Sequence, residues 1–372
     1  MQDVLHRTVT LYLVFRKVMR DNQFLPFIAY CLKEKTTQIP DVMGMDWRGL
    51  YAFSQQQAIV GMVLSGIDRL SKSRKLDVSQ DLLFEWIGQA NMIETQNKLV
   101  NQRVKELTEY LNKQNKKSCV LKGQGNARMY PNPAMRTPGD IDVWIKGTKK
   151  EVVEFVHQRF PDINVQYHHM NYPVFDDVDA EVHYYPSFCY NKWHNYRLQQ
   201  YFRESGEVQF KNVNKEGYVT PTVEFNLVFQ LSHMMRHFFT QGIGLRHAID
   251  YYYLLQQDIS KEESQNAINI MKRCGMYKFL CAMMWIEKEI LELDRNTELA
   301  PANSKTGKMV LREMLKGGNF GHQYQHNQKN LVVAYIGQMM YNMHHVLEFP
   351  SEPISRPFAL TWDYINKHFF RN

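Results

Sequence analysis

VLKGQGNARMYPNPAMRTPGDIDVWI, residues 120–145, joins two short apolar segments through a glycine-containing turn and a proline-rich loop. The first apolar segment predicts a strand at residues 118–121. The turn Lys122-Gly123-Gln124-Gly125 follows it, and its two glycines can adopt backbone angles that other residues avoid. The alternation of acidic and apolar residues over 140–145 predicts a second strand.

Two acidic residues of the second strand lie on one face of it. A period of two places Asp140 and Asp142 side by side, with the apolar residues on the opposite face. Neighbouring carboxylates repel each other unless they are solvated or a cation lies between them. Magnesium takes hard oxygen ligands and binds one or two carboxylates together with substrate phosphates. A glycine turn before a helix offers backbone N–H groups to a phosphate. The stretch therefore predicts a metal site beside a phosphate site.

A third acidic residue is expected from a later strand at 178–184. Asp179, Glu181 and His183 share one face of that strand. Glu181 is the expected third carboxylate of a two-metal site, with Asp179 as the alternative. His183 is expected to contact phosphate or to orient Glu181. The competing interpretation is a solvent-facing strand whose acids serve solubility.

The strand, glycine turn, short helix and Asp-x-Asp strand resemble the core of the DNA polymerase beta-type nucleotidyltransferase superfamily. More narrowly, Leu121-Lys122-Gly123, the stretch from Arg136 to Gly139-Asp140-Ile141-Asp142, and Glu181-Val182-His183 resemble a bacterial family of uncharacterised nucleotidyltransferase-like proteins. The superfamily usually has Gly-Ser or Gly-Gly in the turn. Here the turn reads Gly123-Gln124-Gly125 and lacks a serine hydroxyl.

The resemblance implies a metal-dependent nucleotidyltransferase that moves a nucleoside monophosphate from a nucleoside triphosphate such as ATP to an acceptor hydroxyl. The acceptor is left open as a small molecule, a protein or RNA. Two magnesium ions would be bound by the catalytic residues Asp140, Asp142 and Glu181. The nucleotide would be bound by Lys122, Gly123, Gln124, Gly125, Arg136, His183 and Arg246.

Several basic and histidine residues have a second interpretation. Lys122 is alternatively an exposed lysine before a turn, and Arg136 a guanidinium that pairs with the two aspartates. Arg246 follows Gly242-Ile243-Gly244 and either pairs with Asp250 one helical turn later or points into the cleft. No role is assigned to the four histidines His168, His169, His233 and His237.

The alternative function is a non-catalytic nucleotide-binding or protein-interaction module with the same fold. The missing turn serine favours this alternative, whereas the three carboxylates argue against it. A third hypothesis, an RNA-binding helical protein, predicts steep salt dependence of RNA affinity, but basic residues are little clustered.

Composition indicates a globular chain of 372 residues with a hydrophobic share of 44% and a net charge of +7. The charge is compatible with a polyanionic substrate and equally with a solvated surface. The five cysteines contain no C-x-x-C pair, so free thiols in a reducing compartment are expected. No apolar run is long enough to span a bilayer. We expect a cytoplasmic protein without membrane contact, and the oligomeric state is left open.

The expected fold class is α+β, with a small mixed sheet flanked by helical regions. The predicted divisions are 1–112 (helical), 113–215 (nucleotidyltransferase-like core) and 216–372 (helical). Further strands are predicted at 164–169 and 172–176, and a helix is predicted over 91–112. Thr220 and Pro221 are expected to begin another helix, with Thr220 as its cap.

Overall fold

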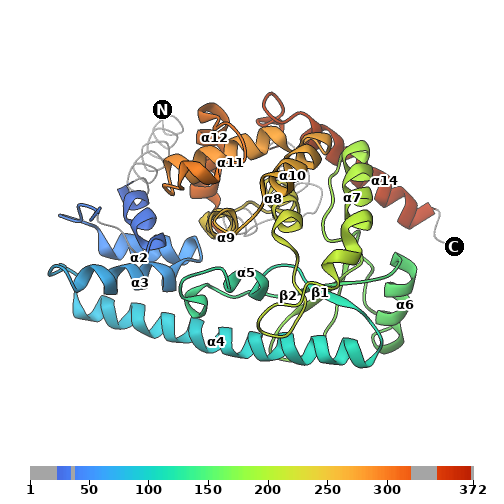
Figure 1. Cartoon of the computed structure of the whole chain (residues 1–372), viewed down its shortest axis with the longest axis horizontal. Coiled ribbons are helices and arrows are strands. Elements are labelled where there is room, and N and C mark those ends of the chain that lie inside the picture. Colours follow the sequence, from blue (N-terminus) through green and yellow to red (C-terminus); the bar gives the residue numbers. More distant parts are fainter. Residues whose placement is uncertain (1–22, 35–37, 320–341, 370–372) are drawn as a thin grey trace, which may run out of the picture.

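The computed structural model describes residues 23–34, 38–319 and 342–369 (Figure 1). In that part of the chain, four short strands form one sheet in the order β1-β2-β4-β3. The strands β1 (Ser118–Val120) and β2 (Ile141–Ile145) are antiparallel, and β2 runs parallel to β4 (Ala180–His183). The edge strand β3 (His169–Asn171) is antiparallel to β4. A mixed sheet among many helices confirms the expected α+β class.

Helices precede, interrupt and follow this sheet. Residues 23–32 are helical, and the labelled elements are α2 (Trp47–Gln56), α3 (Val60–Ser71), α4 (Gln80–Lys113), α5 (Gln124–Ala127), η1 (Pro133–Met135), α6 (Lys149–Arg159), α7 (Lys192–Gln209), α8 (Val223–Phe238), α9 (Leu245–Leu255), α10 (Lys261–Arg273), α11 (Tyr277–Glu289), η2 (Arg295–Thr297), α12 (Ser304–Gly317) and α14 (Ser351–Phe369). None of the helices in the described ranges has the length and apolar character needed to cross a membrane.

The sheet is buried on both faces. One face packs on α4 and α6 through an apolar cluster that includes Val143 and Val182, both fully buried. On the other face Trp144 contacts Phe210 and Phe225, with ring centroids 4.5 and 5.7 Å away. Figure 1 shows α4 on one side of the sheet and α7 and α8 on the other. The sheet is therefore held between two helical layers.

The register of β2 and β4 places acidic residues together. Asp142 is paired with Glu181, and Val143 with Val182. Paired residues of neighbouring strands project from the same face, so the two carboxylates lie side by side while the two valines enter the core. The apolar pair fixes the register, because a slip by one residue would bring acids into the core.

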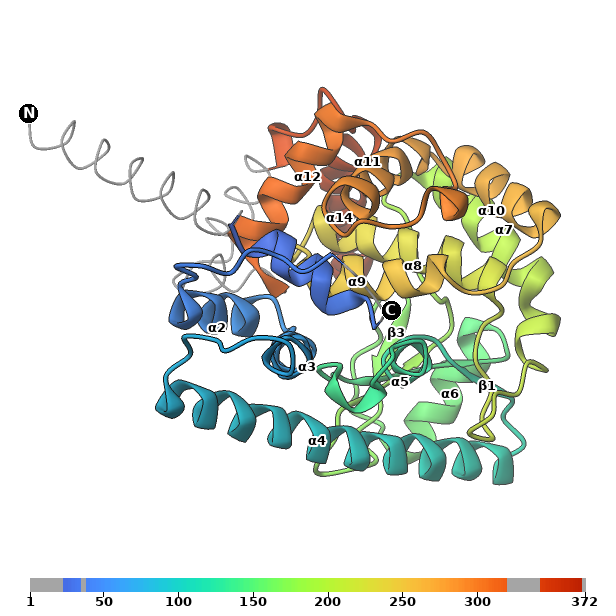
Figure 2. The same cartoon turned by 60° about the vertical axis from the view of Figure 1, so that its left-hand side comes forward.

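The helix α4 is longer than predicted and supports the loop before β2. It begins at Gln80, where the Ser79 hydroxyl accepts a hydrogen bond from the amide of Leu82. The side-chain amide of Asn97 donates to the carbonyls of Ala134 and Arg136 at 2.8 and 2.7 Å. Figure 2 shows α4 running past α5 and the following loop. A helix distant in sequence therefore fixes the segment that leads into the acidic strand.

Two predicted strands differ from the observed ones. Residues 164–168 lie outside β3, because the Gln166 amide donates to the carbonyl of His169 and closes a turn. Residues 172–176 form no strand, although the Tyr172 amide still bonds the carbonyl of Ala180. Pro173 follows directly, and proline has no N–H to continue the ladder.

The predicted cap of α8 is also corrected. The helix begins at Val223, and the hydroxyl of Thr222 accepts from the amide of Phe225. Thr220 instead exchanges backbone and side-chain hydrogen bonds with Asn212. Since both threonines are suitable caps, the contact with Asn212 decides which one begins the helix.

Replacing Asn97 by alanine is expected to destabilise the protein by about 1–3 kcal/mol, because the Ala134 and Arg136 carbonyls lose their donor. Urea denaturation measures the change. Asn91→Ala, at an exposed position of the same helix, is the matched control and is expected to stay within about 0.5 kcal/mol of wild type. Equal effects of the two substitutions would show that Asn97 does not support the loop.

Candidate functional site

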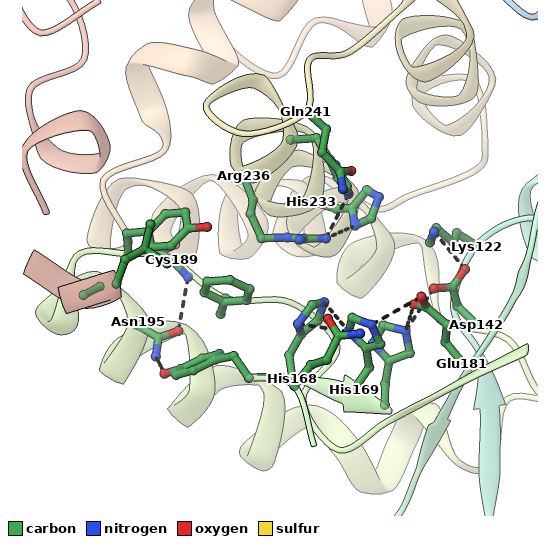
Figure 3. A pocket seen from close by; sticks show the side chains of 18 of the residues that line it. Lys122, Asp142, His168, His169, Glu181, Cys189, Asn195, His233, Arg236 and Gln241 are labelled. Atoms are coloured by element: carbon green, nitrogen blue, oxygen red, sulfur yellow. Dashed lines mark hydrogen bonds and ion pairs between the residues drawn. The ribbon is translucent and has the colours of Figure 1, made fainter. Parts of the chain in front are cut away.

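A cavity of about 850 Å³ opens beside β2 and β4, within the size range of small-molecule sites (Figure 3). Its walls come from the sheet, the segment 188–195, the helix α8 and the helix α14. The lining residues are Lys122, Asp140, Asp142, Gln166, Tyr167, His168, His169, Glu181, His183, Phe188, Cys189, Tyr190, Lys192, Asn195, His233, Arg236, His237, Gln241, Ala359, Leu360 and Trp362.

The acidic end of the cavity contains the three predicted carboxylates. Asp142 is fully buried, and its two oxygens face Nζ of Lys122 at 2.8 Å and Nε2 of His183 at 2.9 Å. Asp140 lies 3.5 Å from the same Lys122 ammonium. Glu181 lies 3.4 Å from Nε2 of His183. Asp142, Glu181 and His183 form a group whose possible ligand atoms lie within 4.8 Å of one another.

The charges at this end stabilise one another. Burial opposes ionisation of Asp142, but Lys122 and His183 outweigh it and lower the pKa of the carboxyl. Burial also opposes ionisation of Glu181, and hydrogen bonds from His169 and His183 hold its pKa well below the usual range. Asp140 differs, since the like charge of Asp142 raises its pKa. Two of the three carboxylates are therefore kept ionised for a cation.

The basic partners are shifted in the opposite direction. Burial disfavours the charged form of Lys122, yet Asp140 and Asp142 raise its pKa above the ordinary value. Burial likewise disfavours protonated His183, but hydrogen bonds to Asp142 and Glu181 raise its pKa to about 9. The ammonium and the imidazolium thus act as internal counter-ions.

The donor set fits a divalent cation. Asp140, Asp142 and Glu181 supply the hard carboxylate oxygens that magnesium prefers. Both oxygens of Asp142 already contact Lys122 or His183, so a cation that binds there must displace at least one of these contacts.

Three histidines lie next to the carboxylates. His168, His169 and His183 have ring nitrogens within 4.8 Å of one another, and all three residues are buried. Burial is the main cause that lowers the pKa of His168 well below its usual value. His169 contacts Glu181 at 3.3 Å. The sequence offered no sign of this grouping, because it depends on the pairing of β3 with β4.

The glycine turn lies against α4, outside the large cavity. Gly123 has φ +63° and precedes α5, which requires a residue that tolerates the left-handed region. Gln124 is buried, and its side-chain amide donates to Oδ1 of Asn101 at 2.8 Å. Gly123, Gln124 and Gly125 are absent from the cavity wall, so Lys122 alone represents this segment there.

The two predicted arginines line a smaller neighbouring cavity. Arg136 binds Asp250 through Nε and Nη2, at 2.8 and 2.7 Å, and Tyr130 donates to the same carboxylate at 2.6 Å. Arg246 donates to the carbonyl of Thr137 at 3.1 Å. Lys122 lines both cavities. The ion pair of Asp250 with Arg136 joins α9 to the loop before β2, which the sequence did not indicate.

Sequence reasoning missed the wall opposite the carboxylates. His233 and Arg236 project from α8 toward the cavity (Figure 3), and His237 lines it as well. Their spacing of three and four residues was a usable signal, since such residues share a helix face.

The wall formed by α14 could not have been found by sequence reasoning, because it comes from a distant part of the chain. Glu352 at the start of α14 accepts from the amides of Tyr190 and Asn191, and it is buried. Burial raises its pKa to about 7.

A family model described as "Uncharacterised nucleotidyltransferase" matches residues 44–292. The matched range includes the three carboxylates, Lys122 and the whole of α8. No curated protein matches the chain. No solved structure matches it either.

In the metal-free protein, the imidazole of His183 is expected to titrate near pH 9. Its folded pKa lies above the ordinary value of 6.5, so protonated His183 stabilises the fold fully below pH 6.5, and this contribution is lost as the pH rises through 9. Histidine NMR signals, assigned by their loss in His183→Gln, give the pKa directly.

The difference in the free energy of unfolding between wild type and His183→Gln should therefore become smaller as the pH rises from 6.5 to 9. The exposed His344 provides the control substitution His344→Gln. A titration of His183 near its ordinary value would contradict the assignment of Asp142 and Glu181 as its partners.

Proposed function

We propose that this chain, which belongs to the family of uncharacterised nucleotidyltransferases, moves a nucleoside monophosphate from a nucleoside triphosphate to an acceptor hydroxyl. The observation that carries the proposal is the register of β2 and β4, which pairs Asp142 with Glu181. With Asp140, these residues bring three carboxylates to one end of a cavity whose volume is within the range of small-molecule sites.

Asp140, Asp142 and Glu181 are the proposed ligands of two magnesium ions. When bound, the ions supply charge neutralisation for the phosphates and polarise the acceptor hydroxyl. Lys122 contacts Asp142 at 2.8 Å, and a cation held by Asp142 would compete for that oxygen, so the ammonium would be able to contact the triphosphate. Lys122 is thus a counter-ion of Asp142 in the metal-free protein and the proposed phosphate ligand when nucleotide and metal are bound.

In the proposed reaction, the acceptor oxygen forms a bond to the α-phosphorus while the bond to the pyrophosphate oxygen breaks. Glu181 lies opposite Asp142 and would help hold the metal nearer the hydroxyl. Asp140, whose pKa is raised by the like charge of Asp142, is the better suited carboxylate to take the hydroxyl proton. His183 contacts both acids and orients them. Such transfer depends mainly on positioning and charge stabilisation.

Arg136 and Arg246 have a positioning role in this proposal. Arg136 is saturated by the bidentate pair with Asp250, and Arg246 bonds the carbonyl of Thr137. Both contacts fix the loop that enters β2 and therefore the place of Asp140. The buried turn Gly123-Gln124-Gly125 supports the same loop from the side of α4.

A second candidate function is a non-catalytic nucleotide-binding or interaction module. The observation that favours it is the occupation of both Asp142 oxygens by Lys122 and His183, together with a glycine turn outside the cavity. A module of this kind binds ligand without turnover.

Asp142→Asn is expected to reduce transfer about a thousandfold, since metal-held charge contributes several kcal/mol and each ~1.4 kcal/mol is a factor of ten. The assay follows label from the α-phosphate of each nucleoside triphosphate, with magnesium, into pools of small hydroxylated molecules, protein and RNA. Asp179→Asn, at an exposed acid of the segment before β4, is the matched control and should retain activity.

Two results would contradict the proposed nucleotidyltransferase activity. One is label transfer by Asp142→Asn at the rate of Asp179→Asn. The other is magnesium-dependent nucleotide binding by wild type with no transfer to any pool, which is the outcome that the non-catalytic module predicts.

A further inference from the structure

A half-buried arginine faces the cavity, and no acidic side chain of the described residues pairs with it. Arg236 projects from α8 toward the side of the cavity that carries His168 and His169 (Figure 3). Its Nη2 contacts Nε2 of His237 at 2.9 Å and Nδ1 of His233 at 3.4 Å. Its Nε is buried and has no hydrogen-bond partner. Within the described ranges, no carboxylate forms an ion pair with Arg236.

The neighbours of Arg236 do not neutralise its charge. Burial lowers the pKa of both His233 and His237 well below the usual value, and the nearby cations lower it further. The two imidazoles are therefore neutral. Because a guanidinium only donates, Nε2 of His237 must accept, which leaves the proton of that ring on Nδ1. The imidazoles orient the guanidinium but supply no counter-charge.

The ion pair of Arg136 with Asp250 shows the kind of partner that a buried guanidinium takes in this protein. Arg136, which is buried near the cavity, is matched by the carboxylate of Asp250 through two hydrogen bonds. A buried charge is costly unless it is paired and hydrogen-bonded. Arg236 is less buried than Arg136, but its Nε is enclosed and unpaired, and the open side of its guanidinium faces the cavity.

We propose that Arg236, oriented by His233 and His237, is a phosphate-binding subsite of the large cavity. Arginine matches phosphate geometry through its planar fork of donors. The phosphate has two possible sources: the polyphosphate of the nucleoside triphosphate, which rests on the function proposed above, or a phosphate group on the acceptor. In either case the ligand lies between the acidic wall of β2 and β4 and the cationic wall of α8.

The cavity supports a phosphate ligand from both sides. Asp140, Asp142 and Glu181 face it with negative charge, and Lys122 already pairs with Asp142 at 2.8 Å. Arg236 faces it from α8 with positive charge. A phosphate that shares a cation with the carboxylates and contacts Arg236 would complement both walls. The guanidinium carbon of Arg236 lies 5.3 Å from the ring centroid of Phe188, which is a cation–π contact.

The test is calorimetric titration of tripolyphosphate and, separately, of glucose 6-phosphate into the full chain without divalent metal. Arg236→Met is expected to lower the affinity for the probe that represents the phosphate source by about ten- to a hundredfold, the range of a charge-assisted hydrogen bond. Arg236→Lys retains the charge but loses the fork, so an intermediate affinity is expected. Arg203→Met, at an exposed residue of α7, is the matched control and should bind as wild type does.

The two probes distinguish the sources. If Arg236→Met binds only tripolyphosphate more weakly, the subsite belongs to the nucleotide. If it binds only glucose 6-phosphate more weakly, the subsite belongs to the acceptor. Equal affinities of wild type and Arg236→Met for both probes, or no binding of either probe by wild type, would overturn the proposal. The double variant Asp140→Ala/Asp142→Ala should still bind the probe, since no metal is present. Loss of catalysis in that variant is therefore a separate result.

Discussion

The parallel pairing of β2 with β4 is the constraint on which the site depends. It sets Asp142 opposite Glu181 and, one position further, Val143 opposite Val182. The valines are fully buried against α4 and α6, so the core determines the register and the register determines the acidic pair. Hydrophobic packing on one face thus holds two like charges together on the other, at a place where they repel each other without a cation.

Residues of the surrounding elements neutralise these negative charges and hold the acids in place. Lys122 and His183 neutralise the acids from within, and Asn97 and the Arg136–Asp250 pair fix the loop that brings Asp140 to them. The opposite wall carries Arg236 with neutral imidazoles. The cavity therefore has an acidic and a cationic side, which is the arrangement that a metal-bound phosphate requires.

Local sequence patterns correctly predicted the strands whose side chains alternate between acidic and apolar residues. The two-residue period over 140–145 identified β2, and the same period identified the acidic face of β4. The prediction that Thr220 caps α8 was wrong. The choice between Thr220 and Thr222 depends on the contact of Thr220 with Asn212, which is distant from the pattern of the helix itself. The turn was found, but its burial against Asn101 of α4 depends on a contact between distant segments.

The groups that escaped sequence reasoning are brought together by packing between distant segments. His168 and His169 approach His183 only through the pairing of β3 with β4, and α14 reaches the cavity from the far end of the chain. Arg236 had a local signal in its spacing from His233 and His237. That its Nε has no hydrogen-bond partner among the described residues appears only in the folded chain.

Calorimetric titration of ATP, GTP, CTP and UTP, with and without magnesium, tests most directly whether the three carboxylates form a metal-dependent nucleotide site. The titrations compare wild type with Asp140→Ala/Asp142→Ala. The expected result is that at least one nucleoside triphosphate binds more tightly with magnesium than without it, and that the double variant loses this difference. No binding by wild type, or equal magnesium-dependent binding by the double variant, would contradict the site.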